Sequence, residues 1–201
     1  AASARSSIPA LEGLLIQAGA GVRVTGYDLR KGIYQNIEAE VEQSGAAVIM
    51  TAKLLGDMMR VLPDGMVTVG VSDGGRTTVK CGMSEYSFMS LPASDYPELP
   101  ESDYSNAITL EQQKLTEIID QTIFAVSSNE SRPVYMGSLF ELENGKLTVV
   151  SVDGYRLALR REEVTGKTES AHFIVPGTVL QDVSRLCAKS EDPVMIDLGE
   201  R

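Results

Sequence analysis

The second half of this chain repeats a pattern set by its first half, and this repeat limits the folds that the chain can adopt. Residues of the same type recur 125 positions apart (153 − 28 = 125), and these pairs are Asp28 and Asp153, Ile49 and Ile174, Leu55 and Leu180, Asp57 and Asp182, and Arg60 and Arg185. Pro9, Gly13 and Leu15 recur after 124 positions, which indicates one inserted residue between the two sets. A period this long is typical neither of a solenoid repeat nor of a propeller blade. It therefore predicts a duplicated domain, an arrangement that commonly builds arcs or rings.

Length and composition fit two compact domains. The chain has 201 residues, of which 43% are hydrophobic, so each half can bury a core of its own. The longest apolar stretches, such as residues 46–50, are too short to cross a bilayer, and no secretory signal is visible at the start. Cys81 and Cys187 are isolated, which favours a reduced intracellular protein but leaves a disulfide between them open. Because both ends look cut, we expect a fragment of a longer protein.

The net charge of −10 bears on possible partners. Phosphate contacts need clustered lysine and arginine, so an acidic total argues against a surface that binds nucleic acid throughout. It leaves open a nucleic-acid binder whose basic residues lie on a single face.

Alternating apolar residues predict antiparallel strands in both halves. Hairpins are expected at residues 14–17 with 22–25, at 67–71 with 77–81, and at 139–142 with 147–150, where Asn144 and Gly145 supply the turn. Residues 86–89 continue the second hairpin, and residues 33–41 are typical of a half-buried strand.

Three segments have helical periodicity instead, at residues 51–62, 109–126 and 176–189. The first of them places five apolar residues on one expected face, namely Leu54, Leu55, Met58, Met59 and Leu62. Pro176 suits the first turn of the third helix. A Pro-, Ser- and acid-rich stretch at residues 92–105 marks the boundary between the halves. Each half is therefore predicted to pack helices on a sheet, an α+β arrangement.

The residues give weak support for an enzyme. His172, the only histidine, has no serine or cysteine motif near it, and an ordinary histidine at a strand edge explains it. Asp28 and Asp153 could be metal ligands of a hydrolase, but their equivalent places in the repeat favour a role in organising one turn each. The glycines form no phosphate-binding loop. We expect neither a metal nor a cofactor.

Polar residues form a stripe on two of the expected helices. Lys53, Asp57 and Arg60 recur at helical spacing, and the second half repeats the stripe with Thr178, Gln181, Asp182, Arg185 and Lys189. One interpretation is a solvated surface with ion pairs one turn apart. The other is that equivalent faces contact a phosphate backbone loosely.

Several longer motifs resemble one known family. They are residues 90–99 (SLPASDYPEL), 7–11 (SIPAL), 26–29 (GYDL), 152–158 (VDGYRLA) and 173–176 (FIVP). In order and over the whole chain, the sequence is similar to the bacterial DNA polymerase III beta subunits, the replication sliding clamps. The resemblance implies the DNA clamp fold, an α+β fold of repeated domains with antiparallel sheets outside and helices lining the inner face. Residues 1–103 would be the first clamp domain without its opening strand and helix, and residues 104–201 most of the second, with the third domain absent.

The resemblance also implies a function. Two full-length chains would form a homodimeric ring around double-stranded DNA, with no catalytic activity, no membrane contact and a cytoplasmic location. The ring would tether the DNA polymerase III catalytic subunit, the clamp loader and other proteins with clamp-binding motifs through a peptide-binding groove. A metal-dependent hydrolase that uses Asp28 and Asp153, and a monomeric protein-binding module that never meets DNA, are the alternatives.

Two sets of site residues follow from the resemblance. The DNA-contacting set is Arg5, Lys53, Arg60, Asn129 and Arg132. The share of the groove in the second domain is Tyr135, Val152, Gly154, Tyr155, Arg156 and Leu157. Apolar anchors would enter the groove while Arg156 fixes the direction of the peptide, although a structural salt bridge is another role for Arg156. The sequence departs from the family at Gly177 and Thr178, where basic residues are common, and at Pro133 and Val134, which replace aromatic residues.

Overall fold

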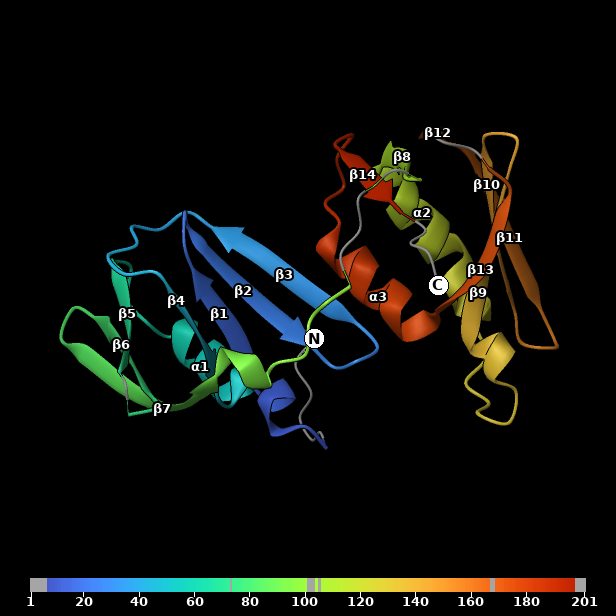
Figure 1. Cartoon of the computed structure of the whole chain (residues 1–201). Helices are drawn as coiled ribbons and strands as arrows, with labels where there is room; N and C mark the ends of the chain where they lie inside the picture. Colours follow the sequence, from blue (N-terminus) through green and yellow to red (C-terminus); the bar gives the residue numbers. More distant parts are fainter. Residues whose placement is uncertain (1–6, 73, 101–103, 105, 167–168, 198–201) are drawn as a thin grey trace. The chain divides into compact units, whose positions relative to one another are not determined.

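The computed structural model describes residues 7–72, 74–100, 104, 106–166 and 169–197. The chain divides into two compact units, Ala1–Pro100 and Glu101–Arg201 (Figure 1). Each unit combines antiparallel strands with helices, which confirms the predicted α+β class. The hairpins predicted around residues 18–22, 72–76 and 143–146 are confirmed as well.

The first unit is built on a 7-stranded sheet in the order β3-β2-β1-β4-β7-β6-β5. Its strands are β1 (Leu14–Ala18), β2 (Val22–Tyr27), β3 (Gly32–Ile37), β4 (Gly45–Ile49), β5 (Val67–Ser72), β6 (Arg76–Cys81) and β7 (Ser84–Pro92). Every neighbouring pair is antiparallel. Helix α1 (Ala52–Met59) and two 3₁₀ turns, η1 (Pro9–Glu12) and η2 (Ala93–Asp95), complete the unit.

Strand β4 supplies side chains to both faces of this sheet. Val48 and Ile49 are both fully buried, since neighbouring residues of a strand point to opposite faces. Ile49 packs with Leu55 and Met58 of α1, whereas Val48 packs with Leu11 and its neighbours on the other side. Residues 47–49 of the apolar run at 46–50 are therefore buried on both faces of the sheet, whereas Ala46 is exposed.

The second unit contains two sheets and two helices. The larger sheet has the order β11-β10-β9-β13, and the smaller one β12-β8-β14. The strands are β8 (Ile108–Glu111), β9 (Gly137–Glu143), β10 (Lys146–Val152), β11 (Leu157–Glu163), β12 (Thr165–Gly166), β13 (Ala171–Pro176) and β14 (Pro193–Ile196). The helical elements are α2 (Gln112–Thr122), η3 (Ile123–Ala125), η4 (Pro133–Met136) and α3 (Gly177–Leu186).

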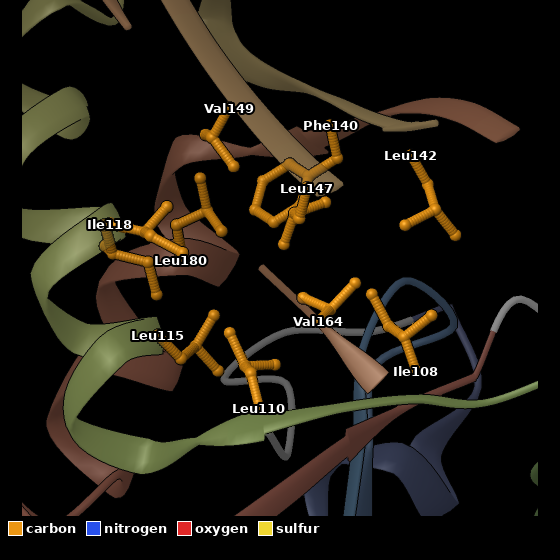
Figure 2. Close-up of a cluster of buried hydrophobic side chains, with 11 residues drawn as sticks. Ile108, Leu110, Leu115, Ile118, Phe140, Leu142, Leu147, Val149, Val164 and Leu180 are labelled. Atoms are coloured by element: carbon orange, nitrogen blue, oxygen red, sulfur yellow. The ribbon is translucent and has the colours of Figure 1, made fainter. Parts of the chain in front are cut away.

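Aliphatic side chains from both helices and both sheets, together with Phe140, fill the core of the second unit (Figure 2). Leu115 and Ile118 of α2 and Leu180 of α3 point towards Leu147 and Phe140 of the larger sheet. Outside the core, a hydrogen bond from Ser184 Oγ to Asp120 Oδ1 (3.1 Å) joins the two helices. The helices are thereby fixed against the sheet and against each other.

Gly13 and Gly137 hold equivalent positions in the two units, and both positions require glycine for the same structural reason. A Cβ on Gly13 would lie 2.7 Å from the carbonyl oxygen of Ile49, and a Cβ on Gly137 would lie 2.5 Å from that of Val175. Both distances are far below van der Waals contact, so only glycine lets the neighbouring strand approach so closely. The repeat in the sequence therefore corresponds to a repeat in packing.

The predicted start of the helix at residues 109–126 is wrong. Residues 108–111 form strand β8, which pairs with β14, and α2 begins only at Gln112. Ile108 and Leu110 are buried while Thr109 and Glu111 are more exposed, a period of two that belongs to a strand. The apolar spacing of the helix that follows hid this short strand.

Three other predictions need correction. On α1, Leu54 and Met59 are exposed and only Leu55 and Met58 are buried, because the helix has 8 residues and one narrow buried stripe. Strand β3 ends at Ile37 rather than at residue 41, and all of it is exposed because it lies at the sheet edge. Helix α3 ends at Leu186, where Cys187 turns extended, and Pro176 is the residue before its first turn.

Both cysteines are free thiols, with Cys81 buried in the first unit and Cys187 half-buried in the second. No helix in the described part of the chain is long and apolar enough to cross a membrane. Burial raises the pKa of the Cys187 thiol, so it is mostly protonated at neutral pH.

Candidate functional site

The second unit has a pocket of about 530 Å³ where two loops meet. One loop follows η3, and the other is the turn between β10 and β11. The lining residues are Val126, Ser127, Ser128, Asn129, Arg132, Asp153, Gly154, Tyr155 and Arg156. The pocket therefore combines residues that are more than twenty positions apart in the sequence.

Asp153 organises one wall of this pocket. Its Oδ1 accepts hydrogen bonds from the backbone N–H groups of Tyr155 (2.9 Å) and Arg156 (3.1 Å), which closes an Asx turn. Gly154 has a φ of 94°, a left-handed conformation that glycine adopts without strain. The Tyr155 N–H lowers the pKa of Asp153 most, lost hydration opposes this, and Arg156 lowers the pKa further. The predicted turn role of Asp153 is confirmed.

Arg156 is held over the pocket by two contacts. Its Nε donates a hydrogen bond to Asp153 Oδ2 at 2.8 Å, and its guanidinium carbon lies 5.6 Å from the ring centre of Phe124. The structural salt bridge considered for Arg156 thus exists. The side chain is nevertheless 58% exposed, so the guanidinium keeps donors free for a ligand.

Exposed apolar side chains are found on the same segments. Tyr155 is 100% exposed, and more than half of the surface of Phe124, Val134 and Leu157 is also accessible. Tyr155 lines the pocket itself, Leu157 follows the pocket residue Arg156 in the chain, and Phe124 contacts the Arg156 guanidinium. The pocket and these side chains can together hold a ligand with apolar and polar groups.

The structure brings most of the predicted groove residues together. Gly154, Tyr155 and Arg156 line the pocket, and Val152 and Leu157 are opposite each other where β10 and β11 separate. Tyr135 closes the far side of the loop, where its carbonyl oxygen accepts a hydrogen bond from the Ser127 N–H (2.8 Å).

Two residues predicted to contact DNA lie in the same pocket. Asn129 and Arg132 line it together with the groove residues. Asn129 Oδ1 accepts hydrogen bonds from the N–H (3.0 Å) and hydroxyl (2.8 Å) of Ser131, so this side chain shapes its own loop. The guanidinium carbon of Arg132 lies 6.0 Å from the ring centre of Tyr135. From the sequence, these two residues and the groove are predicted to belong to separate sites.

Residues 124–128 are a part of the site that the sequence interpretation missed. Phe124 contacts Arg156, and Val126, Ser127 and Ser128 line the pocket. The sequence predicts residues 124–126 as the end of a helix and assigns no role to Ser127 and Ser128. The Ser127–Ser128 pair after the apolar segment was the available signal for a loop.

The polar helix stripe lies partly on α1 and partly on α3. Lys53 is exposed on α1, and Arg60, just after α1, forms an ion pair with Asp57 at 2.8 Å. Arg185 forms the equivalent pair with Asp182 at 3.8 Å. The predicted ion pairs one turn apart are therefore present in both units. Arg5 lies outside the described residues.

The turn of Asp153 has a counterpart in the first unit. Asp28 Oδ1 accepts hydrogen bonds from the N–H groups of Arg30 (2.9 Å) and Lys31 (2.8 Å). Slight burial raises the pKa of Asp28, but these N–H groups outweigh it and bring the pKa below its usual value. Within the described residues, no three His, Cys, Asp or Glu side chains are grouped to hold a metal. The two aspartates are turn-forming residues.

Two successive units of antiparallel sheet and helix, related by an internal repeat, define a protein with tandem clamp-type domains. Residues 1–100 match the family model for the N-terminal domain of the DNA polymerase III beta subunit, and residues 109–201 match the model for its central domain. The chain belongs to the DNA polymerase III beta subunit family.

Known members of the family are similar over the whole chain. The beta sliding clamp of Halalkalibacterium halodurans is 34% identical over 100% of this chain and 56% of its own length. The crystal structure of the Bacillus subtilis clamp superposes with a TM-score of 0.94 at 31% identity, covering 100% of this chain and 55% of that one. The crystal structure of a Pseudomonas aeruginosa clamp bound to griselimycin superposes with a TM-score of 0.90 at 28% identity. The match covers 99% of this chain and 55% of that one. The chain thus spans about half the length of these relatives.

Proposed function

We propose that this chain is part of a DNA sliding clamp, in which two complete chains form a ring around double-stranded DNA. The observation that carries the proposal is the match of both units, in order, to the N-terminal and central domains of the beta subunit family. The domains are assigned to residues 1–103 and 104–201, and a third domain outside this sequence would complete the ring. The protein would act in the cytoplasm as a tether and not as an enzyme.

A ring explains how an acidic protein with few cations stays on DNA. Topological closure prevents sideways escape, so weak contacts to phosphates suffice and sliding stays fast. An open cleft with the same cations would release DNA as salt rises. We assign the weak contacts to Arg5, Lys53, Arg60, Asn129 and Arg132, of which Lys53 and Arg60 are exposed residues on α1 and just after it.

The pocket of the second unit is the proposed site for partner peptides. A short apolar peptide would place its anchors on Tyr155 and Leu157, while Arg156 and the backbone around Gly154 bind its polar groups. Such peptides would come from the DNA polymerase III catalytic subunit, the clamp loader and other proteins with clamp-binding motifs. Asn129 and Arg132 lie within reach of the same peptide.

The proposal can be tested by primer extension on a long single-stranded circle. The cognate polymerase and clamp loader are assayed with and without the full-length protein that contains this chain. We expect products per binding event to lengthen at least tenfold when the protein is present. Products of equal length with and without it would contradict a role as the processivity factor.

A further inference from the structure

Each unit contains an arginine that is neutralised by an aspartate one helical turn earlier. Arg60 Nη1 lies 2.8 Å from Asp57 Oδ1, and Arg185 Nη1 lies 3.8 Å from Asp182 Oδ1. Both arginines remain more than three-quarters exposed, at 78% and 77% of their side-chain surface. The pairs hold equivalent positions in the repeat (182 − 57 = 125; 185 − 60 = 125).

Stability alone does not explain these pairs. Ion pairs between exposed side chains one turn apart add little to stability, because water and salt screen them and both side chains lose freedom. Buried leucines beside them, Leu55 and Leu180, already fix the two helices in their units. A role in binding is the better explanation for charges that stay in solvent in both units.

The carboxylates of Asp57 and Asp182 affect how strongly Arg60 and Arg185 can bind a phosphate. An arginine gains DNA affinity by neutralising a phosphate and releasing its counterions. When a carboxylate already holds the guanidinium, the pair carries no net charge, and part of the donor set is engaged. The arginine then binds a phosphate only by giving up or sharing its aspartate. Phosphate contact is therefore weakened without loss of the cation.

We propose that Asp57 and Asp182 act as intramolecular competitors that weaken the hold of Arg60 and Arg185 on DNA and so keep sliding fast. The inference rests on the proposed clamp function and assigns a new role to one acidic residue on each of the helices α1 and α3. It predicts a stronger effect for Asp57, whose oxygen is closer to its arginine than that of Asp182. Neutral replacement of either aspartate should make the clamp bind more tightly and move more slowly.

The test uses the full-length protein with Asp57→Asn and Asp182→Asn, measured in two ways. Affinity for a short linear duplex is followed by fluorescence anisotropy over a range of salt concentrations, and diffusion of the loaded clamp is followed on single DNA molecules. We expect each variant to bind about three- to tenfold tighter at low salt. The slope of the logarithm of the binding constant against the logarithm of the salt concentration should become steeper by about 0.9 for each released arginine. Diffusion should slow by a similar factor.

Two controls separate this role from a general effect of charge. Glu85→Gln removes the same charge and frees Lys80, its partner at 3.3 Å, but lies on a strand hairpin instead of a helix. It should leave affinity and diffusion unchanged. In the Arg60→Gln background, Asp57→Asn should also have no effect, since no arginine is left to release.

Three results would overturn the proposal: unchanged affinity in both aspartate variants, an equal gain in Glu85→Gln, or an equal gain of Asp57→Asn without Arg60. Loading of the wild-type protein onto closed circles is measured in parallel. If the wild type is retained on circles but the variants behave like it, the competitor role fails and the clamp function stands. If the wild type is not retained, the proposed function itself fails.

Discussion

Leu29 and Gly154 occupy the same position in the two units, one residue after the turn-forming aspartate, and both have a left-handed backbone. Their φ angles are 69° and 94°. Glycine adopts this conformation freely, whereas a leucine there is strained by its Cβ. The duplicated turn is thus relaxed in the unit that contains the pocket and strained in the other.

Exchanging these residue types should have opposite effects on stability. Leu29→Gly should stabilise the folded state by about 1–2 kcal/mol because it removes the strain of a left-handed leucine. It should also cost about 0.4–1 kcal/mol because glycine gives the unfolded chain more conformational freedom. The free energy of unfolding should therefore rise by about 0.5–1 kcal/mol. Gly154→Ala has space for its Cβ but should cost about 1 kcal/mol for the backbone alone. Urea unfolding measures the free energy of unfolding of both variants. Changes of the same sign would contradict a turn that is strained at Leu29 and relaxed at Gly154.

The two aspartate turns should make stability depend on pH. The pKa of both Asp28 and Asp153 is lower in the folded state than in the unfolded one. A lowered pKa adds stability above the unfolded value, near pH 4, and that stability is lost as the pH falls through the folded pKa. Asp153→Asn should therefore unfold more easily at pH 7, with the difference from wild type shrinking below pH 4. A difference that stays constant from pH 7 to pH 2.5 would exclude this linkage.

The buried face of α3 provides a test of the packing. Leu180 is 3% exposed in the core, whereas Leu186 at the end of the same helix is 68% exposed. Leu180→Ala should lower the free energy of unfolding by about 2–5 kcal/mol because it opens a cavity. Leu186→Ala is the matched control and should change it by less than about 0.5 kcal/mol. Chemical denaturation measures both, and similar losses would show that the helix face is misassigned.

Tyr155 should contribute to partner binding without contributing to stability. Because its side chain is fully exposed, Tyr155→Ala should leave the unfolding midpoint unchanged. Loss of an aromatic anchor should weaken binding of a partner peptide at least about tenfold, which isothermal titration calorimetry can measure. Tyr34→Ala removes another exposed tyrosine, on β3 of the first unit, and should leave peptide binding intact. Equal losses in both variants would refute the location of the groove.

Local patterns in the sequence predicted most of the elements. Alternation and turn residues predicted the hairpins, and the repeat predicted Asp28 and Asp153 as turn residues, a role that their hydrogen bonds confirm. Patterns failed where two periods overlap, as at β8, whose alternating Ile108 and Leu110 run directly into a helix. They also failed at β3, because its exposure depends on its place at a sheet edge and not on its own residues.

The site could be predicted only in part. Gly154, Tyr155 and Arg156 belong to one motif, so a resemblance to the family was enough to group them. Asn129 and Arg132 lie on a different loop, and only the folded second unit shows that they line the same pocket. No local signal encodes a contact between loops that far apart.

Retention on DNA tests the ring most directly. The full-length protein is loaded onto nicked circular DNA, and bound protein is measured before and after a restriction enzyme linearises the circle. Topological linkage predicts that the protein stays on circles for many minutes, even in salt that abolishes equilibrium binding to short duplexes, and leaves within seconds of cutting. Equal dissociation from circular and linear DNA would contradict the sliding-clamp account.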